Sequence, residues 1–125
     1  MRVPAPIPEL PVDDLESAGA FYRQKLGFSV DWVYQDLLAG VSRDDARIYL
    51  RKRTGEESRS GYKVLIWINL DSVTAVDELY EDWKRNGVPI ADALETSAYN
   101  LRQFIAEDAD GNQLRVFHDL GPSQN

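Results

Sequence analysis

Histidine and cysteine, two residue types often used in catalysis and metal binding, are scarce in this chain. It has one histidine, His118, and no cysteine, so thiolate nucleophiles, disulfides and cysteine-based zinc sites are excluded. There is no glycine-rich phosphate loop and no nucleophile motif. Glu9 and Glu107 could act as general bases only if the fold buried them. His118 shares a strand face with Leu114 and Val116, not with Arg115 and Phe117, which predicts a capping or surface histidine outside any cleft.

The strand predicted over residues 63–70 carries the clearest candidate for ligand binding. Side chains alternate across a strand, and one face of this strand is purely aliphatic. The other face places Trp67 near Asn69, an arrangement typical of a surface that meets a ligand; packing of Trp67 into a second core is the alternative. Stacking of a flat ligand contributes on the order of 1–3 kcal/mol per aromatic. The aliphatic face comprises Val64, Ile66, Ile68 and Leu70, and the mixed face comprises Lys63, Leu65, Trp67 and Asn69.

Two amphipathic helices are predicted to cover the aliphatic faces of such strands. The first would begin at Asp13 as N-cap, with Glu16 completing a capping box. The second would be capped by Asp71 or Ser72. Each helix would end at a glycine. The apolar stripes are Leu15, Ala18, Phe21, Tyr22 and Leu26 before Gly27, and Val73, Val76, Leu79, Tyr80 and Trp83 before Gly87.

Segments with strand or turn composition predict the remaining elements. The proline-rich residues 1–12 suit an edge or crossover strand. Alternation in 28–34 predicts one face made of Phe28, Val30, Trp32 and Tyr34. The charged segment 52–61 is expected to be an exposed loop. Further strands are predicted over 37–43 and 46–51, joined by Asp44 and Asp45, around 93–97, and over 102–107 and 113–118, joined by the turn 108–112.

The two halves of the chain repeat the same order of elements. Each half has a strand, a helix ended by glycine, and a later hairpin, which makes a β-α-β-β-β module. We therefore predict one α+β domain over 1–121, with modules at about 1–60 and 61–121. The modules would pair into a curved mixed sheet around a cleft, with the helices on the outer face. Residues 122–125 are expected to form a disordered tail.

Composition narrows the classes of partner. A length of 125 residues leaves no room for a separate cofactor domain. The 14 Lys and Arg residues against 21 Asp and Glu give a net charge of −7, which disfavours nucleic acid and anionic membranes. A neutral or cationic partner is favoured, or the charge serves solubility alone. With no membrane-spanning run and no signal peptide, a cytoplasmic protein is expected.

Two motifs resemble a known family. Residues 11–28, PVDDLESAGAFYRQKLGF, resemble the opening of the glyoxalase, bleomycin-resistance and dioxygenase proteins, the vicinal oxygen chelate superfamily, and residues 108–114, DADGNQL, resemble its closing hairpin. In this superfamily chemistry usually runs through a divalent metal. The resemblance places four residues at the ligand positions, none of them a plausible ligand, so no metal and no cofactor is expected. They are Ile7, which a register slip could replace by Glu9, and Tyr49, Leu65 and Arg115.

Within the superfamily, the likeness is to bleomycin-binding resistance proteins. It is carried by residues 26–34, 39–45 and 77–83. It implies a homodimer that sequesters an aromatic, possibly cationic drug without modifying it. Leu37 and Leu38, and the segment 99–101, depart from that family's pattern and put the ligand's identity in doubt. The implied cleft residues are Trp32, Leu38, Tyr49, Leu65, Trp67, Tyr99, Arg102, Arg115 and Phe117.

Other functions stay open at this point. The two arginines of the cleft suggest an anionic or carbonyl-bearing group on the ligand, or internal pairing with Glu95, Glu107 or Asp119. A metal-dependent or carboxylate-based lyase, isomerase or dioxygenase of the same fold is the main alternative to a binding protein. A ligand sensor or a structural subunit would share the same pocket.

Overall fold

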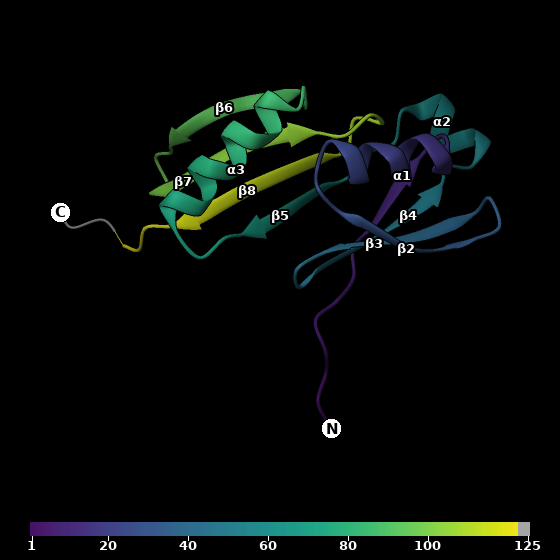
Figure 1. The fold of residues 1–125 in the computed structure, drawn as a ribbon, viewed down its shortest axis with the longest axis horizontal. Helices are drawn as coiled ribbons and strands as arrows, with labels where there is room; N and C mark the ends of the chain where they lie inside the picture. The colour runs from purple at the N-terminus through teal and green to yellow at the C-terminus, as the bar shows by residue number, and fades with distance from the viewer. Residues whose placement is uncertain (123–125) are drawn as a thin grey trace. The chain divides into compact units, whose positions relative to one another are not determined.

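A computed structural model describes residues 1–122 and consists of two compact units, Met1–Lys63 and a second unit that begins at Val64. Each unit contains one four-stranded mixed sheet and one long helix in the order β-α-β-β-β, which confirms the α+β modules (Figure 1). Among the described residues, no helix is long and apolar enough to cross a membrane.

The first unit contains four strands and two helices. Its strands lie in the order β1-β4-β3-β2, with β1 parallel to β4 and the other pairs antiparallel. The proline-rich opening therefore supplies an edge strand, as predicted. The elements are β1 (Glu9–Val12), α1 (Leu15–Gln24), β2 (Ser29–Tyr34), β3 (Leu38–Arg43), β4 (Ala46–Lys52) and α2 (Gly55–Ser60).

Helix α1 packs its apolar stripe on the sheet of the first unit. Leu15, Ala18 and Tyr22 are buried, and the ring of Tyr22 meets Phe28 edge-on. The predicted N-cap, Asp13, is wrong by one residue. The cap is Asp14, whose carboxylate accepts a hydrogen bond from the Ser17 amide, because the helix begins at Leu15.

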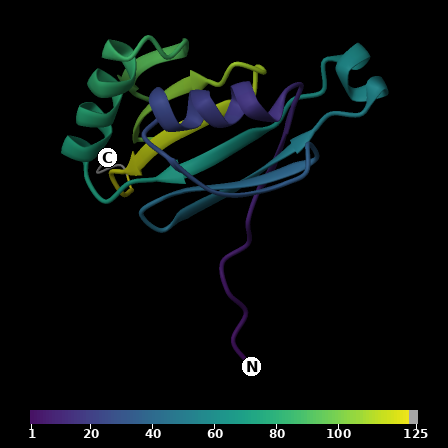
Figure 2. The same cartoon turned by 45° about the vertical axis from the view of Figure 1, so that its right-hand side comes forward.

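Helix α2 occupies the segment that was predicted to be a loop. It has no buried residue, so the sequence shows no apolar periodicity that would predict it. A capping box stabilises its start: the Thr54 hydroxyl accepts a hydrogen bond from the Glu57 amide, and the Glu57 carboxylate accepts one from the Thr54 amide. Gly61, with φ of 70°, ends the helix. The helix follows β4 as a separate short element (Figure 2).

A bulge in β2 overturns the predicted alternation of that strand. Val30 pairs with Val41, whereas Trp32 pairs with Gly40, so Asp31 is an extra residue. Val41 is buried, but Trp32 is 39% exposed. Val30 and Trp32 therefore lie on opposite faces, because one extra residue reverses the side on which every later side chain falls.

The second unit repeats the arrangement of the first. Its strands lie in the order β5-β8-β7-β6, with β5 parallel to β8. Helix α3, capped by Ser72, buries Val76, Tyr80 and Trp83, and the last two rings meet Phe104 edge-on. The elements are β5 (Leu65–Asn69), α3 (Val73–Arg85), β6 (Ile90–Thr96), β7 (Leu101–Glu107) and β8 (Gln113–Asp119).

The turn 108–112 joins β7 to β8 and also hydrogen-bonds to the backbone just before β5. The Asp108 carboxylate accepts hydrogen bonds from the amides of Asp110 and Asn112. Asn112 is fully buried, and its side-chain oxygen accepts from the Val64 amide, next to β5. The side chains of Asp108 and Asn112 thus accept hydrogen bonds from backbone amides, which explains why turn-forming residues occur here. Of the predicted tail, 122–125, only Pro122 is among the described residues.

Candidate functional site

Each unit leaves one face of its sheet uncovered by its own helix, and each of these faces carries an exposed tryptophan. We call them the Trp32 face and the Trp67 face and describe each within its own unit. The Trp32 face consists of Glu9, Trp32, Tyr34, Leu38, Gly40, Tyr49 and Arg51, and the Trp67 face consists of Leu65, Trp67, Asn69, Gln103, Ile105, Gln113, Arg115 and Phe117.

The Trp32 face has an aromatic row across its strands. Trp32, Gly40, Tyr49 and Glu9 are successive Cα partners from β2 to β1. The indole reaches across β3 to Tyr49, with ring centroids 5.2 Å apart at 76°. A Cβ on Gly40 would lie 2.5 Å from Nε1 and Cε2 of Trp32. Glycine therefore allows the indole to approach this closely, and a larger residue at position 40 would displace the ring.

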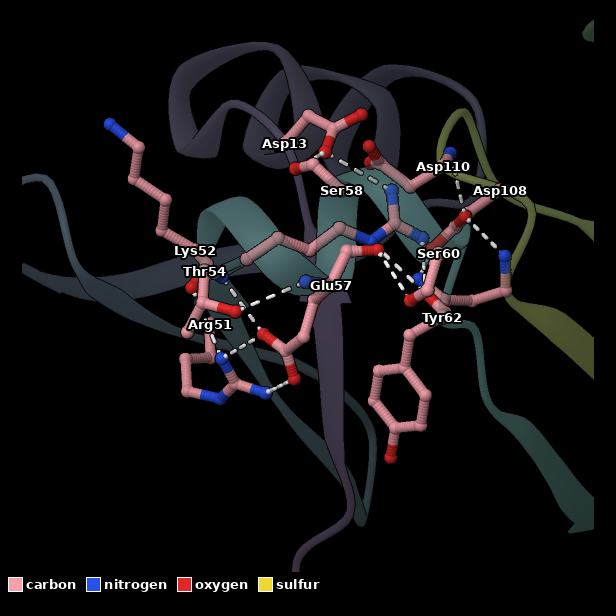
Figure 3. Close-up of polar contacts among 12 residues, drawn as sticks. Asp13, Arg51, Lys52, Thr54, Glu57, Ser58, Ser60, Tyr62, Asp108 and Asp110 are labelled. Carbon is pink, nitrogen blue, oxygen red and sulfur yellow. Dashed lines mark hydrogen bonds and ion pairs between the residues drawn. The ribbon is translucent and has the colours of Figure 1, made fainter.

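Arg51 is a charged residue of the Trp32 face and binds two carboxylates. Its guanidinium donates to both carboxylate oxygens of Glu57, each at 2.8 Å (Figure 3). It also pairs with Glu9. Hydrogen bonds from Arg51, and then from the Thr54 amide, lower the pKa of Glu57 from 4.5 to about 2. This bidentate pair ties α2 to β4.

On the Trp67 face, the predicted phase of β5 is confirmed. Ile66 and Ile68 pair with the buried Leu114 and Val116, whereas Trp67 lies on the opposite face and is 54% exposed. Its ring meets Phe117 edge-on, at 5.4 Å and 83°. Trp67 is thus not a core residue of its unit.

Arg115 lies beside Trp67 on the neighbouring strand. Its guanidinium carbon is 4.5 Å from the centroid of the Trp67 ring, a cation–π contact. One terminal nitrogen donates to the side-chain oxygen of Gln103 at 3.0 Å. Its Nε is buried and donates no hydrogen bond to any residue in 1–122. Of the two alternatives left open for Arg115, pairing with an internal carboxylate is not observed among the described residues.

The other predicted site residues divide between the faces and the rest of the fold. Leu38 lies on the Trp32 face, paired with Tyr34, and Leu65 lies on the Trp67 face. Tyr99 lies on neither, because it belongs to the exposed turn before β7.

Arg102 is not brought together with the Trp67 face. It alternates with Gln103, lies on the helix-covered side of β7 and pairs with Asp77 of α3 at 2.8 Å. Its expected place in the cleft, and its expected internal partners, are therefore corrected. His118, its Cα partner, has Nδ1 2.9 Å from the Leu70 carbonyl oxygen on the same side.

Gly40 and Gln103 are among the face residues that the sequence prediction missed. Gly40 could have been flagged as a glycine inside a strand, where it loses conformational entropy without a turn to require it. Gln103 had no signal, because its role depends on the register that sets it beside Phe117 and near Arg115.

Known proteins share this sequence pattern and this fold. Residues 6–116 match the sequence model of the Glyoxalase/Bleomycin resistance protein/Dioxygenase superfamily. The chain belongs to this superfamily. No curated protein matches it.

Solved structures of the superfamily are similar at low identity. A bleomycin resistance determinant encoded on the transposon Tn5 has a TM-score of 0.78 at 22% identity, covering 95% of this chain and 100% of that one. A bleomycin-binding protein complexed with bleomycin gives 0.77 at 22%, covering 94% and 99%. A lactoylglutathione lyase from Agrobacterium tumefaciens gives 0.72 at 18%, covering 91% and 92%. These likenesses establish the fold, which hosts both binding and catalysis.

The metal chemistry of the superfamily does not fit this member. Tyr49 and Arg115 lie on the central strands β4 and β8. A phenol is a poor ligand for a divalent cation, and a guanidinium cannot act as one. Glu9, the alternative ligand to Ile7, pairs with Arg51. In residues 1–122, no three His, Cys, Asp or Glu side chains are grouped as a metal site requires.

Proposed function

We propose that this protein binds flat aromatic small molecules, such as an antibiotic of the bleomycin type, and holds them without chemical change. The observation that carries the proposal is the pair of helix-free faces. Each face presents a partly exposed tryptophan that a second aromatic ring steadies edge-on, Tyr49 for Trp32 and Phe117 for Trp67. An indole held in this way offers stacking area at little cost in conformational entropy.

The polar residues of the faces support binding over catalysis. Glu9 is exposed and paired with Arg51, and Glu107 accepts a hydrogen bond from Gln113 at the end of the hairpin. Neither has the buried setting that a general base active near neutral pH requires. The similarity in fold to bleomycin-binding proteins supports the choice of ligand class.

A homodimer is part of the proposal. Exposed apolar side chains lie on each face and on the β2–β3 hairpin, and contiguous apolar surface of this kind marks interaction sites. A second copy would cover them and leave room for the ligand. These side chains are Trp32, Val33, Tyr34, Leu37, Leu65 and Trp67.

Titration of bleomycin-family drugs against tryptophan fluorescence tests the proposal. Trp83 is buried and gives a constant background, whereas Trp32 and Trp67 report on the faces. We expect saturable quenching at micromolar or lower drug concentration, reduced in Trp32→Phe or Trp67→Phe. Unchanged fluorescence together with no heat of binding for every drug would reject the proposed ligand class.

A further inference from the structure

We propose that the ligand of the Trp67 face carries a carboxylate or another anionic group next to its ring, and that Arg115 binds this group. The inference rests on the proposed function and specifies the class of ligand. It starts from the partners of Arg115, which differ from those of Arg51, Arg53 and Arg102.

Arg115 has no counter-charge among residues 1–122. Arg51 pairs with Glu9 and Glu57, Arg53 with Asp13, and Arg102 with Asp77. Within residues 1–122, Arg115 has no ion pair and donates only to the neutral side chain of Gln103. Of the two arginines on the faces, Arg51 is paired with carboxylates and Arg115 is not.

An unpaired guanidinium is costly and stays charged. Arginine has five N–H donors and no accessible neutral form, so it cannot relieve its burial by losing a proton. Arg115 uses one terminal donor on Gln103, and its buried Nε has no acceptor among the described residues. A carboxylate on a ligand would supply the missing charge and take two parallel hydrogen bonds.

The position of the guanidinium adds a ring to the anion requirement. It lies 4.5 Å from the Trp67 centroid, while Trp67 keeps 54% of its surface exposed. An anion held by Arg115 therefore brings an attached ring against Trp67 or Phe117, which are in edge contact. An aromatic acid satisfies both requirements with one rigid molecule.

Binding of 2-naphthoate and of its neutral isostere 2-naphthamide, measured by calorimetry, tests the inference. The overall charge of −7 repels anions, so any preference for the acid must arise locally. We expect wild type to bind the acid about tenfold more tightly than the amide, as one charge-assisted pair allows. In Arg115→Gln this ratio should fall to about one, with amide binding kept.

Arg102→Gln is the matched control, because it removes the same charge from the opposite side of the same sheet. It should keep the preference for the acid. Equal affinities in wild type, which needs no variant to fold, would overturn the inference and leave the proposed function standing. A preference that survives in folded Arg115→Gln would also overturn it. If neither naphthalene probe nor any bleomycin-family drug binds, the proposed function fails as well.

Discussion

Trp67 and Trp83 are two tryptophans of one unit in opposite surroundings. Trp83 on α3 is 1% exposed and packs against Phe104, whereas Trp67 is 54% exposed beside Phe117 and Arg115. Truncation of each should therefore affect a different measurable quantity, ligand affinity or stability.

For Trp67→Ala we expect ligand binding to weaken by roughly 1–3 kcal/mol, the loss of one stacking partner. The melting temperature should change little. Trp83→Ala should cost about 3–5 kcal/mol of stability, because it opens a cavity in the core. Melting curves must be compared at several protein concentrations, since dissociation of a dimer could resemble a core defect. Large, concentration-independent destabilisation of Trp67→Ala with unchanged binding would show that Trp67 is structural.

Gly40→Ala should displace the Trp32 indole, because the new Cβ would lie 2.5 Å from its ring. The indole is at the surface and can move, and alanine is better than glycine in a strand by roughly 0.5–1 kcal/mol, so the melting temperature should stay close to wild type. The near-ultraviolet circular dichroism of the Trp32–Tyr49 pair should change and drug affinity should fall.

Trp32→Ala provides the reference for this change. With the indole removed, Gly40→Ala should have no further effect on binding, which a double-mutant cycle measures. Equal losses from Gly40→Ala in both backgrounds would mean that Gly40 acts through the strand itself.

At the scale of elements, periodicity and capping predicted most of the fold. They gave both long helices, the phase of β5 and the turn 108–112. They failed where a single residue or a local motif determines the structure. The bulge at Asp31 places Trp32 on the other face, and the Thr54 capping box stabilises α2 without buried apolar residues. Arg102 was predicted on the wrong side of its strand, and its partner Asp77 lies on another element and could not be read from spacing.

Helix α2 should loosen in acid. The folded state lowers the pKa of Glu57 from 4.5 to about 2, so the carboxylate form is favoured by folding. Its contribution is complete above pH 4.5 and is lost as the pH falls towards 2. Protection of the amides in residues 55–60, the exchange rate relative to the intrinsic rate at each pH, should fall over this window in wild type. Glu57→Gln should show low protection at every pH, while Glu56→Gln should follow wild type. High protection in Glu57→Gln that does not change with pH would contradict this role of the pair with Arg51.

At the scale of the whole molecule, the exposed aromatic faces predict self-association. Trp32 on one face and Trp67 on the other are exposed, and a second copy would cover such apolar side chains. Sedimentation velocity should give a dimer at micromolar concentration. A monomer under these conditions would count strongly against the dimer.

The central claim is that this member of the superfamily binds an aromatic ligand without a metal and leaves it intact. The most direct test is calorimetric titration of a metal-free bleomycin into protein freed of metal by a chelator, followed by mass spectrometry of the recovered drug. We expect saturable binding, no change when the protein is incubated with zinc, iron, manganese or nickel and freed of unbound metal before the titration, and a drug of unaltered mass. Binding that appears only after metal is restored, with about one ion per chain, or a recovered drug of altered mass, would contradict the claim.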